Sequence, residues 1–167
     1  RNKMNNFLPP EAKKVLVLSP HPDDESIGCA GTIWLYSKSG TEVYLVVVSD
    51  GEKLETAKDN INIVELRRSE TIGAANILGI KKIIFLGFPD ERLDEYKVNI
   101  KEEISKIIKE INPDIVFAPF PLDPHLDHRV TAEVLLSIHR DLRGFNIAFY
   151  EIYNAIRFNV LWIFLWS

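Results

Sequence analysis

The sequence predicts an α/β protein with a doubly wound, mainly parallel sheet that carries helices on both faces. Short apolar runs rich in β-branched residues recur along the chain, and segments with helical spacing of apolar residues lie between them. Strands that alternate with helices in this way favour a parallel sheet. In the usual strand order 3-2-1-4-5, the first and fourth strands are neighbours, and a crevice opens between their carboxyl ends.

The first elements are a strand, a helix and a second strand. Residues 15–18 form a continuous apolar run, which is typical of a buried strand. A helix is expected over about 27–37, and Ser39 and Gly40 supply its end. Residues 42–49 form a second β-branched run and hence a second buried strand.

The middle of the chain repeats the pattern. Residues 50–60 are polar and are expected to form a loop, and a helix follows with apolar residues at helical spacing over 63–77. Gly79 is expected to cap that helix. Residues 82–86 predict a third, short strand, and residues 87–90 predict a turn.

The last elements are the most regular. Isoleucines recur at helical spacing over 98–111, and Pro113 stops this amphipathic helix. A fourth strand is expected at 115–118, a helix with its apolar face over 130–138 follows, and 146–153 predicts a fifth strand.

A dense polar cluster follows the first strand. The stretch from His21 to Glu25 holds one imidazole and three carboxylates. Like charges packed so closely repel one another unless a cation lies among them, which favours a bound metal. The alternative is that Asp23, Asp24 and Glu25 form the first turn of a helix, whose dipole favours anions.

A second polar cluster follows the fourth strand, where residues 123–128 read Asp-Pro-His-Leu-Asp-His. His125 and His128 are three residues apart and would share one face of a helical turn. Asp123 is the predicted N-cap of this helix, with Pro124 at its first position. Because the first and fourth strands should end side by side, the two clusters together favour one metal site of histidine and carboxylate ligands.

Composition and charge exclude several classes of protein. The 167 residues are expected to form a single domain over 1–167. A net charge of -4 and a pI near 5.6 argue against a nucleic-acid partner. The only cysteine, Cys29, excludes a cysteine-rich metal site and favours a reducing, cytoplasmic location. A dinucleotide site is also disfavoured, because no G-x-G-x-x-G follows the first strand.

The longest apolar run lies at the end of the chain, over residues 160–166. It is far shorter than the roughly 20 residues of a transmembrane helix, so no membrane span is expected. Since such a run should not remain in water, we expect it to pack as an extra strand or to form a contact in a homo-oligomer.

These motifs resemble the LmbE-like/PIG-L family of zinc-dependent de-N-acetylases. The resemblance rests on the sequence His-Pro-Asp-Asp-Glu at 21–25, followed by Gly-Cys-Ala-Gly-Thr at 28–32, and on His-Leu-Asp-His at 125–128. Shorter matches lie at 67–70, 74–79 and 86–90, and the match spans about 15–153.

The resemblance implies a Rossmann-like fold and hydrolysis of the acetyl, or another acyl, group from an N-acetylglucosamine-type amide in a small-molecule conjugate. It implies zinc ligands at His21, Asp24 and His128, a general base at Asp23, an oxyanion-stabilising or proton-donating group at His125, and substrate contacts at Arg67 and Asp90. Family members usually continue beyond the fifth strand, so the C-terminal part of the usual domain is expected to be missing here.

The chemistry of the side chains fits these roles. In a turn stiffened by Pro22, Asp24 can reach the metal while Asp23 faces a bound water. Amide hydrolysis requires a base within reach of that water. His125 would act as an imidazolium on the oxyanion or the leaving amine, and Asp127 either holds the ring of His125 or caps the helix. For Arg67 the alternative to a substrate contact is a solvated helix face.

Two other functions remain open from the sequence. The first is a metal-dependent phosphohydrolase, because paired aspartates also suit magnesium, although histidine-rich ligation disfavours it. The second is a truncated, non-catalytic relative that only binds a metal.

Overall fold

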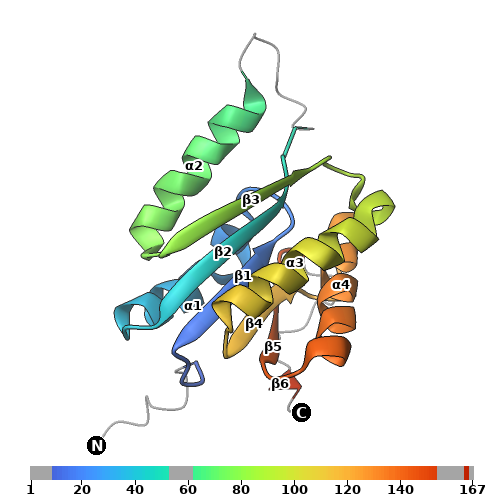
Figure 1. Ribbon diagram of the computed structural model, residues 1–167. Helices are drawn as coiled ribbons and strands as arrows, with labels where there is room; N and C mark the ends of the chain where they lie inside the picture. The colour runs from blue at the N-terminus through green and yellow to red at the C-terminus, as the bar shows by residue number, and fades with distance from the viewer. Residues whose placement is uncertain (1–8, 53–61, 154–163, 166–167) are drawn as a thin grey trace, which may run out of the picture.

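The computed structural model describes residues 9–52, 62–153 and 164–165 of the chain. Its six-stranded sheet has the order β3-β2-β1-β4-β5-β6, in which the first five strands pair in parallel (Figure 1). The strands are β1 (Lys14–Ser19), β2 (Glu42–Ser49), β3 (Lys82–Phe88), β4 (Ile115–Pro119), β5 (Asn146–Tyr150) and β6 (Phe164–Leu165). The predicted order 3-2-1-4-5 is confirmed.

In the described ranges, four α-helices and a short 3₁₀ helix connect the strands. They are α1 (Asp24–Lys38), α2 (Ile63–Leu78), η2 (Leu93–Tyr96, the 3₁₀ helix), α3 (Lys97–Ile111) and α4 (Leu126–Leu142). The expected ends of α2 and α3 are confirmed. Gly79 caps α2 in the left-handed region at φ 74°, and Asn112 does the same for α3 just before Pro113.

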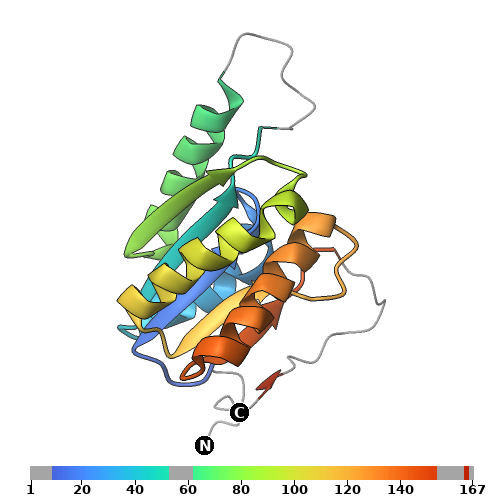
Figure 2. The ribbon, with the colours of Figure 1, turned by 45° about the vertical axis from the view of Figure 1, so that its right-hand side comes forward.

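Both faces of the sheet are covered, as predicted. In β1, Leu16 and Leu18 pack into a core with α3 and α4, whereas Val15 and Val17 pack with α1 on the opposite face. This alternation follows from the two-residue period of a strand. Figure 2 shows α3 and α4 side by side on one face, with α1 behind the sheet.

Several predicted boundaries change. Helix α1 begins at Asp24 rather than near residue 27, so the acidic residues do lie in its first turn. Strand β3 continues to Phe88, into the turn expected at 87–90, and β5 ends at Tyr150 instead of 153. Most of the loop expected at 50–60 lies outside the described residues.

The predicted start of the last helix is wrong. The N-cap of α4 is His125, and neither Asp123 nor Pro124 belongs to the helix. Instead, Asp123 Oδ1 accepts a hydrogen bond from the backbone N–H of His125 at 2.8 Å. A short aspartate side chain competes in this way with helix formation, so the turn extends two residues further before the helix begins.

The end of the chain adds a strand to the sheet. Phe164–Leu165 form β6, which pairs antiparallel with Ile147 and Ala148 of β5. This agrees with the extra strand expected for 160–166, and the other residues of that range lie outside the described part. Among the described residues, no helix is both long and apolar enough to cross a bilayer.

A close approach at Gly28 fixes the start of α1 against the sheet. A Cβ atom at Gly28 would lie 2.2 Å from the ring of Tyr150, so only glycine fits there. The Tyr150 hydroxyl donates a hydrogen bond to Leu18 O at 2.8 Å. The loop before α1 therefore leaves the sheet at a fixed place, directly beside the end of β4.

Candidate metal centre

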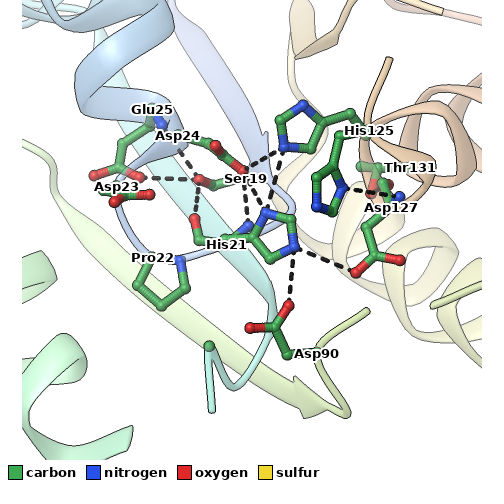
Figure 3. A network of polar contacts seen from close by, with 12 residues as sticks. Ser19, His21, Pro22, Asp23, Asp24, Glu25, Asp90, His125, Asp127 and Thr131 are labelled. Carbon is green, nitrogen blue, oxygen red and sulfur yellow. Dashed lines mark hydrogen bonds and ion pairs between the residues drawn. The ribbon is translucent and has the colours of Figure 1, made fainter. Parts of the chain in front are cut away.

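The three residues predicted to bind metal, His21, Asp24 and His128, converge at the carboxyl ends of β1 and β4. Figure 3 shows His21 and Asp24 together with His125, Asp90 and Asp127. His21 Nδ1 lies 3.1 Å from Asp24 Oδ2, and His128 Nε2 lies 3.3 Å from each of these two atoms. Ligands about 2.0–2.1 Å from a tetrahedral zinc ion are separated by about 3.3 Å, so the three atoms are spaced as such an ion requires. The residues present fit a metal with three protein ligands.

Carboxylates lie against the other nitrogen of each histidine ring. His21 Nε2 is 3.1 Å from Asp90 Oδ1 and 3.2 Å from Asp127 Oδ2. His128 Nδ1 is 3.1 Å from Asp123 Oδ1, although the two groups are not aligned for a hydrogen bond. A carboxylate behind a histidine ligand orients the ring and raises its basicity, and both rings have such a neighbour.

Two other groupings of residues could also hold an ion. The first joins His125 to His21 and His128, and the second joins His21 to Asp90 and Asp127. In the second, the Asp127 carboxylate also accepts the backbone N–H groups of Glu91 at 2.8 Å and Leu93 at 3.2 Å. Because its carboxylate is already held by these bonds, Asp127 is better suited to orient the ring of His21 than to bind a separate ion together with His21 and Asp90.

Burial and close charges shift the pKa values of the candidate ligands His21 and Asp24 in the metal-free protein. Burial alone would lower the pKa of His21, but hydrogen bonds with Asp127, Asp24 and Asp90 raise it to about 11. Burial alone would raise the pKa of Asp24, but hydrogen bonds with the two histidines hold it well below its usual range. In the metal-free protein, the surrounding carboxylates therefore favour the protonated form of His21.

We expect metal affinity to increase with pH. His21, with its pKa raised to about 11, is protonated at neutral pH, and an ion binding at Nδ1 must displace that proton. Affinity should thus change by about tenfold per pH unit for each proton displaced, as long as the pH stays below that pKa. Calorimetry of the metal-free protein in two buffers with different ionisation enthalpies would count the protons, and binding without proton release would contradict this expectation.

Asp23, the predicted general base, lies beside the site in an unusual conformation. It occupies the N-cap position of α1 at φ 118° and ψ -22°, and its side chain makes no capping hydrogen bond. The carboxylate is half-exposed and forms an ion pair with Arg67 at 3.1 Å. Partial burial raises the pKa of Asp23 above its usual value, and the charge of Arg67 offsets part of that rise.

His125 lies next to the ligands without belonging to the closest trio. Its ring centroid is 4.8 Å from that of His21 and 4.7 Å from that of His128. Nδ1 accepts the backbone N–H of Asp127 at 3.3 Å, which assigns the ring proton to Nε2. Burial and the two neighbouring histidines lower the pKa of His125, so the structure favours a neutral ring over the predicted imidazolium.

The predicted partner of Asp127 also changes. The sequence suggested that its carboxylate holds the ring of His125, but the carboxylate bonds to His21, and His125 contacts Asp127 through the backbone N–H. Whether the Asp127 carboxylate bonds to the ring of His21 or to that of His125 depends on how the loops that carry these residues pack together. The spacing of residues within one loop does not contain this information.

The two predicted substrate contacts both lie against the site. Arg67 is only 11% exposed at its side chain, so the solvated-face alternative is wrong. Its Nη2 donates to Pro22 O at 2.7 Å and to Asp23 Oδ2 at 3.1 Å. Asp90 is buried and faces His21. A substrate role for Arg67 and Asp90 stays a prediction.

Sequence reasoning missed one aromatic residue at the site. The ring of Tyr153 stacks on His128 with a centroid distance of 5.7 Å and an angle of 17°, while 55% of Tyr153 remains exposed. It follows β5, whose carboxyl end lies at the same edge of the sheet as those of β1 and β4. Its position at the end of the predicted fifth strand, at the edge where the site was expected, could have identified Tyr153 as a candidate site residue.

Replacement of Asp127 by asparagine should weaken metal binding by about 10–100-fold, which is typical for the loss of a support behind a histidine ligand. The amide cannot accept all three hydrogen bonds that the carboxylate accepts from His21, Glu91 and Leu93, because one of its two polar groups is a donor. A competition titration with a chelator measures the change. Unchanged affinity would show that Asp127 does not support His21.

Comparison with known proteins agrees with the resemblance seen in the sequence. The family described as PIG-L: GlcNAc-PI de-N-acetylase matches residues 16–139. A diacetylchitobiose deacetylase of Thermococcus kodakarensis is 38% identical over 125 residues, which cover 71% of this chain and 46% of that protein. A Bacillus anthracis protein named "Probable N-acetyl-alpha-D-glucosaminyl L-malate deacetylase 2" is 34% identical over 131 residues, which cover 74% of this chain and 58% of that protein.

A solved structure agrees with the fold. The N,N'-diacetylchitobiose deacetylase from Pyrococcus horikoshii matches with a TM-score of 0.76 and 34% identity, over 84% of this chain and 61% of that one. The chain spans about half the length of the curated relatives it matches. Each comparison therefore concerns only a part of the relative.

Proposed function

The chain belongs to the PIG-L family of de-N-acetylases, and on that premise we propose that it is a zinc-dependent hydrolase that removes an acetyl group from an N-acetylglucosamine-type amide. The observation that carries this proposal is the convergence of His21 Nδ1, Asp24 Oδ2 and His128 Nε2 within 3.3 Å of one another. The names of the similar proteins, which are deacetylases of amino-sugar compounds, support the substrate class.

Zinc suits this set of ligands better than magnesium does. Two imidazole nitrogens and one carboxylate oxygen are typical of a catalytic zinc site, whereas magnesium prefers oxygen ligands. When bound at such a site, zinc lowers the pKa of water and polarises an amide carbonyl. His21, Asp24 and His128 would hold the ion, and Asp127 and Asp123 would orient the two rings.

Asp23 would accept the proton of the attacking water. Arg67 binds Oδ2 of Asp23, and within the described part of the chain this arrangement leaves Oδ1 to act as the base. Burial raises the pKa of Asp23, and the raised pKa strengthens this carboxylate as a proton acceptor.

His125 would stabilise the charge that develops on the carbonyl oxygen. Because Nδ1 is an acceptor, Nε2 carries the proton and can donate a hydrogen bond to that oxygen. A neutral imidazole has this function in other enzymes, where a lowered pKa keeps the ring uncharged. His125 therefore needs no positive charge for the proposed role.

The alternatives differ in their support. The deacetylase names of the similar proteins agree with the main proposal and not with a phosphohydrolase. A non-catalytic role remains to be tested, because the chain matches only a part of each relative. A cytoplasmic location, a single domain over 1–167 and self-association through residues 160–166 stay predictions.

Acetate release tests the function directly. Metal-free protein would be incubated with N,N'-diacetylchitobiose or other N-acetylglucosamine conjugates after addition of zinc, magnesium or no metal. We expect acetate only with zinc or a similar transition metal. Stoichiometric zinc binding without acetate from any conjugate would favour the non-catalytic alternative, and activity with magnesium alone would contradict the assignment of zinc.

A further inference from the structure

The guanidinium group of Arg67 connects two loops at the edge of the site. Nη2 donates hydrogen bonds to Pro22 O at 2.7 Å and to Asp23 Oδ2 at 3.1 Å, and Nη1 donates to Gly51 O at 3.4 Å. Arg67 itself lies in the first half of α2. The side chain therefore joins α2 to the loops that follow β1 and β2, and its donors are directed at the protein.

The packing around this contact is close. Gly51 has a φ of 69°, and a Cβ atom there would lie 2.9 Å from Pro22 Cδ and 3.2 Å from Arg67 Cδ. Any larger residue would push Pro22 or Arg67 away. Arg67 is thus held by contacts along its aliphatic stem as well as by the hydrogen bonds of its guanidinium group.

Asp23 needs such a partner for two reasons. Its backbone lies at φ 118°, a region that costs free energy for any residue with a side chain, and surrounding contacts must maintain it. Asp23 also precedes Asp24, whose carboxylate belongs to the metal site. A bond from Arg67 to Asp23 Oδ2 keeps the two neighbouring carboxylates in separate places.

We infer that Arg67 is a positioning residue that fixes Asp23 for proton transfer. The inference rests on the proposed function, because it takes Asp23 as the general base. It differs from the substrate contact that the family resemblance implied for this arginine. A guanidinium group can bond a carbonyl and a carboxylate at once in a fixed fork, whereas a lysine ammonium cannot reproduce that fork.

The kinetic test compares Arg67→Ala and Arg67→Lys with Arg68→Ala, all in the zinc-loaded protein. Arg68 is the adjacent control, since it lies on the same helix with its guanidinium over Phe85. We expect both Arg67 variants to keep zinc and near-normal KM while kcat falls, by on the order of 10²-fold for alanine, because the base is misplaced. Added guanidinium ion should restore part of the activity of Arg67→Ala. A raised KM with unchanged kcat would instead identify a substrate contact and overturn the inference.

A second measurement does not depend on catalysis. Hydrogen exchange should become faster in the segment from Pro22 to Ile27 in Arg67→Ala, because the Ser26 and Ile27 amides bond to Asp23 O at 2.8 and 3.0 Å. If the wild type releases no acetate but exchange still increases, Arg67 holds Asp23 in place and it is the proposed function, with the role in proton transfer, that fails. Unchanged exchange in Arg67→Ala and in Arg67→Lys would overturn the inference. Arg67→Lys keeps the test decisive if the alanine variant does not fold.

Discussion

Alanine in place of Asp24 or His128 should remove bound zinc and acetate release together. Each variant deletes one of the three atoms that lie within 3.3 Å of one another, and two ligands cannot hold the ion as three do. The loss of zinc affinity should exceed the roughly 10–100-fold loss expected for Asp127→Asn, because that substitution removes only a hydrogen-bond partner of the His21 ring. Metal content after dialysis and acetate release, measured on the same preparations, give the answer.

Matched controls exist for both substitutions. His139→Ala replaces a histidine of α4 that bonds to Phe145 O at 2.9 Å, outside the candidate site, and Asp94→Ala replaces an exposed aspartate of η2. Both should retain zinc. Full zinc content in Asp24→Ala would instead favour the alternative grouping of His21 with His125 and His128.

The place where the two polar clusters meet could be predicted from the sequence because it depends on the order of the strands. Continuous apolar runs predicted buried parallel strands, and the usual order of such strands places the ends of β1 and β4 side by side. The residues after those two strands then had to meet. Only the side-chain types, which are given by the sequence, and the usual strand order of a doubly wound fold were needed.

The contacts within the site could not be predicted in the same way. The spacing of three residues predicted that His125 and His128 share one face of a helical turn. In the structure, His125 lies just outside the helix, in the N-cap position. Spacing also could not reveal that Asp90, from the loop after β3, and Asp127 share one nitrogen of His21. Such contacts depend on the packing of separate loops, and a local pattern carries no information about that packing.

Asparagine in place of Asp23 should leave zinc in place and lower kcat by about 10²–10⁴-fold, which is the usual contribution of a general base. The amide has nearly the same shape as the carboxylate and can still accept a hydrogen bond from Arg67 through its oxygen, but it cannot take a proton from water. Zinc content and kcat are measured together, with Asp94→Asn as the control for a change of one exposed aspartate to asparagine. Loss of zinc from Asp23→Asn would make Asp23 a ligand.

The pH profile adds a second criterion for Asp23. A base must be deprotonated to act, and the pKa of Asp23 is raised by burial, so the wild-type rate should fall as the pH drops through that raised pKa. Zinc binding should also weaken in acid, because a proton on His21 competes with the ion, so the profile must be recorded with zinc in excess. Under that condition the residual rate of Asp23→Asn should lack this acid limb. If the limb persists unchanged, another group carries the proton.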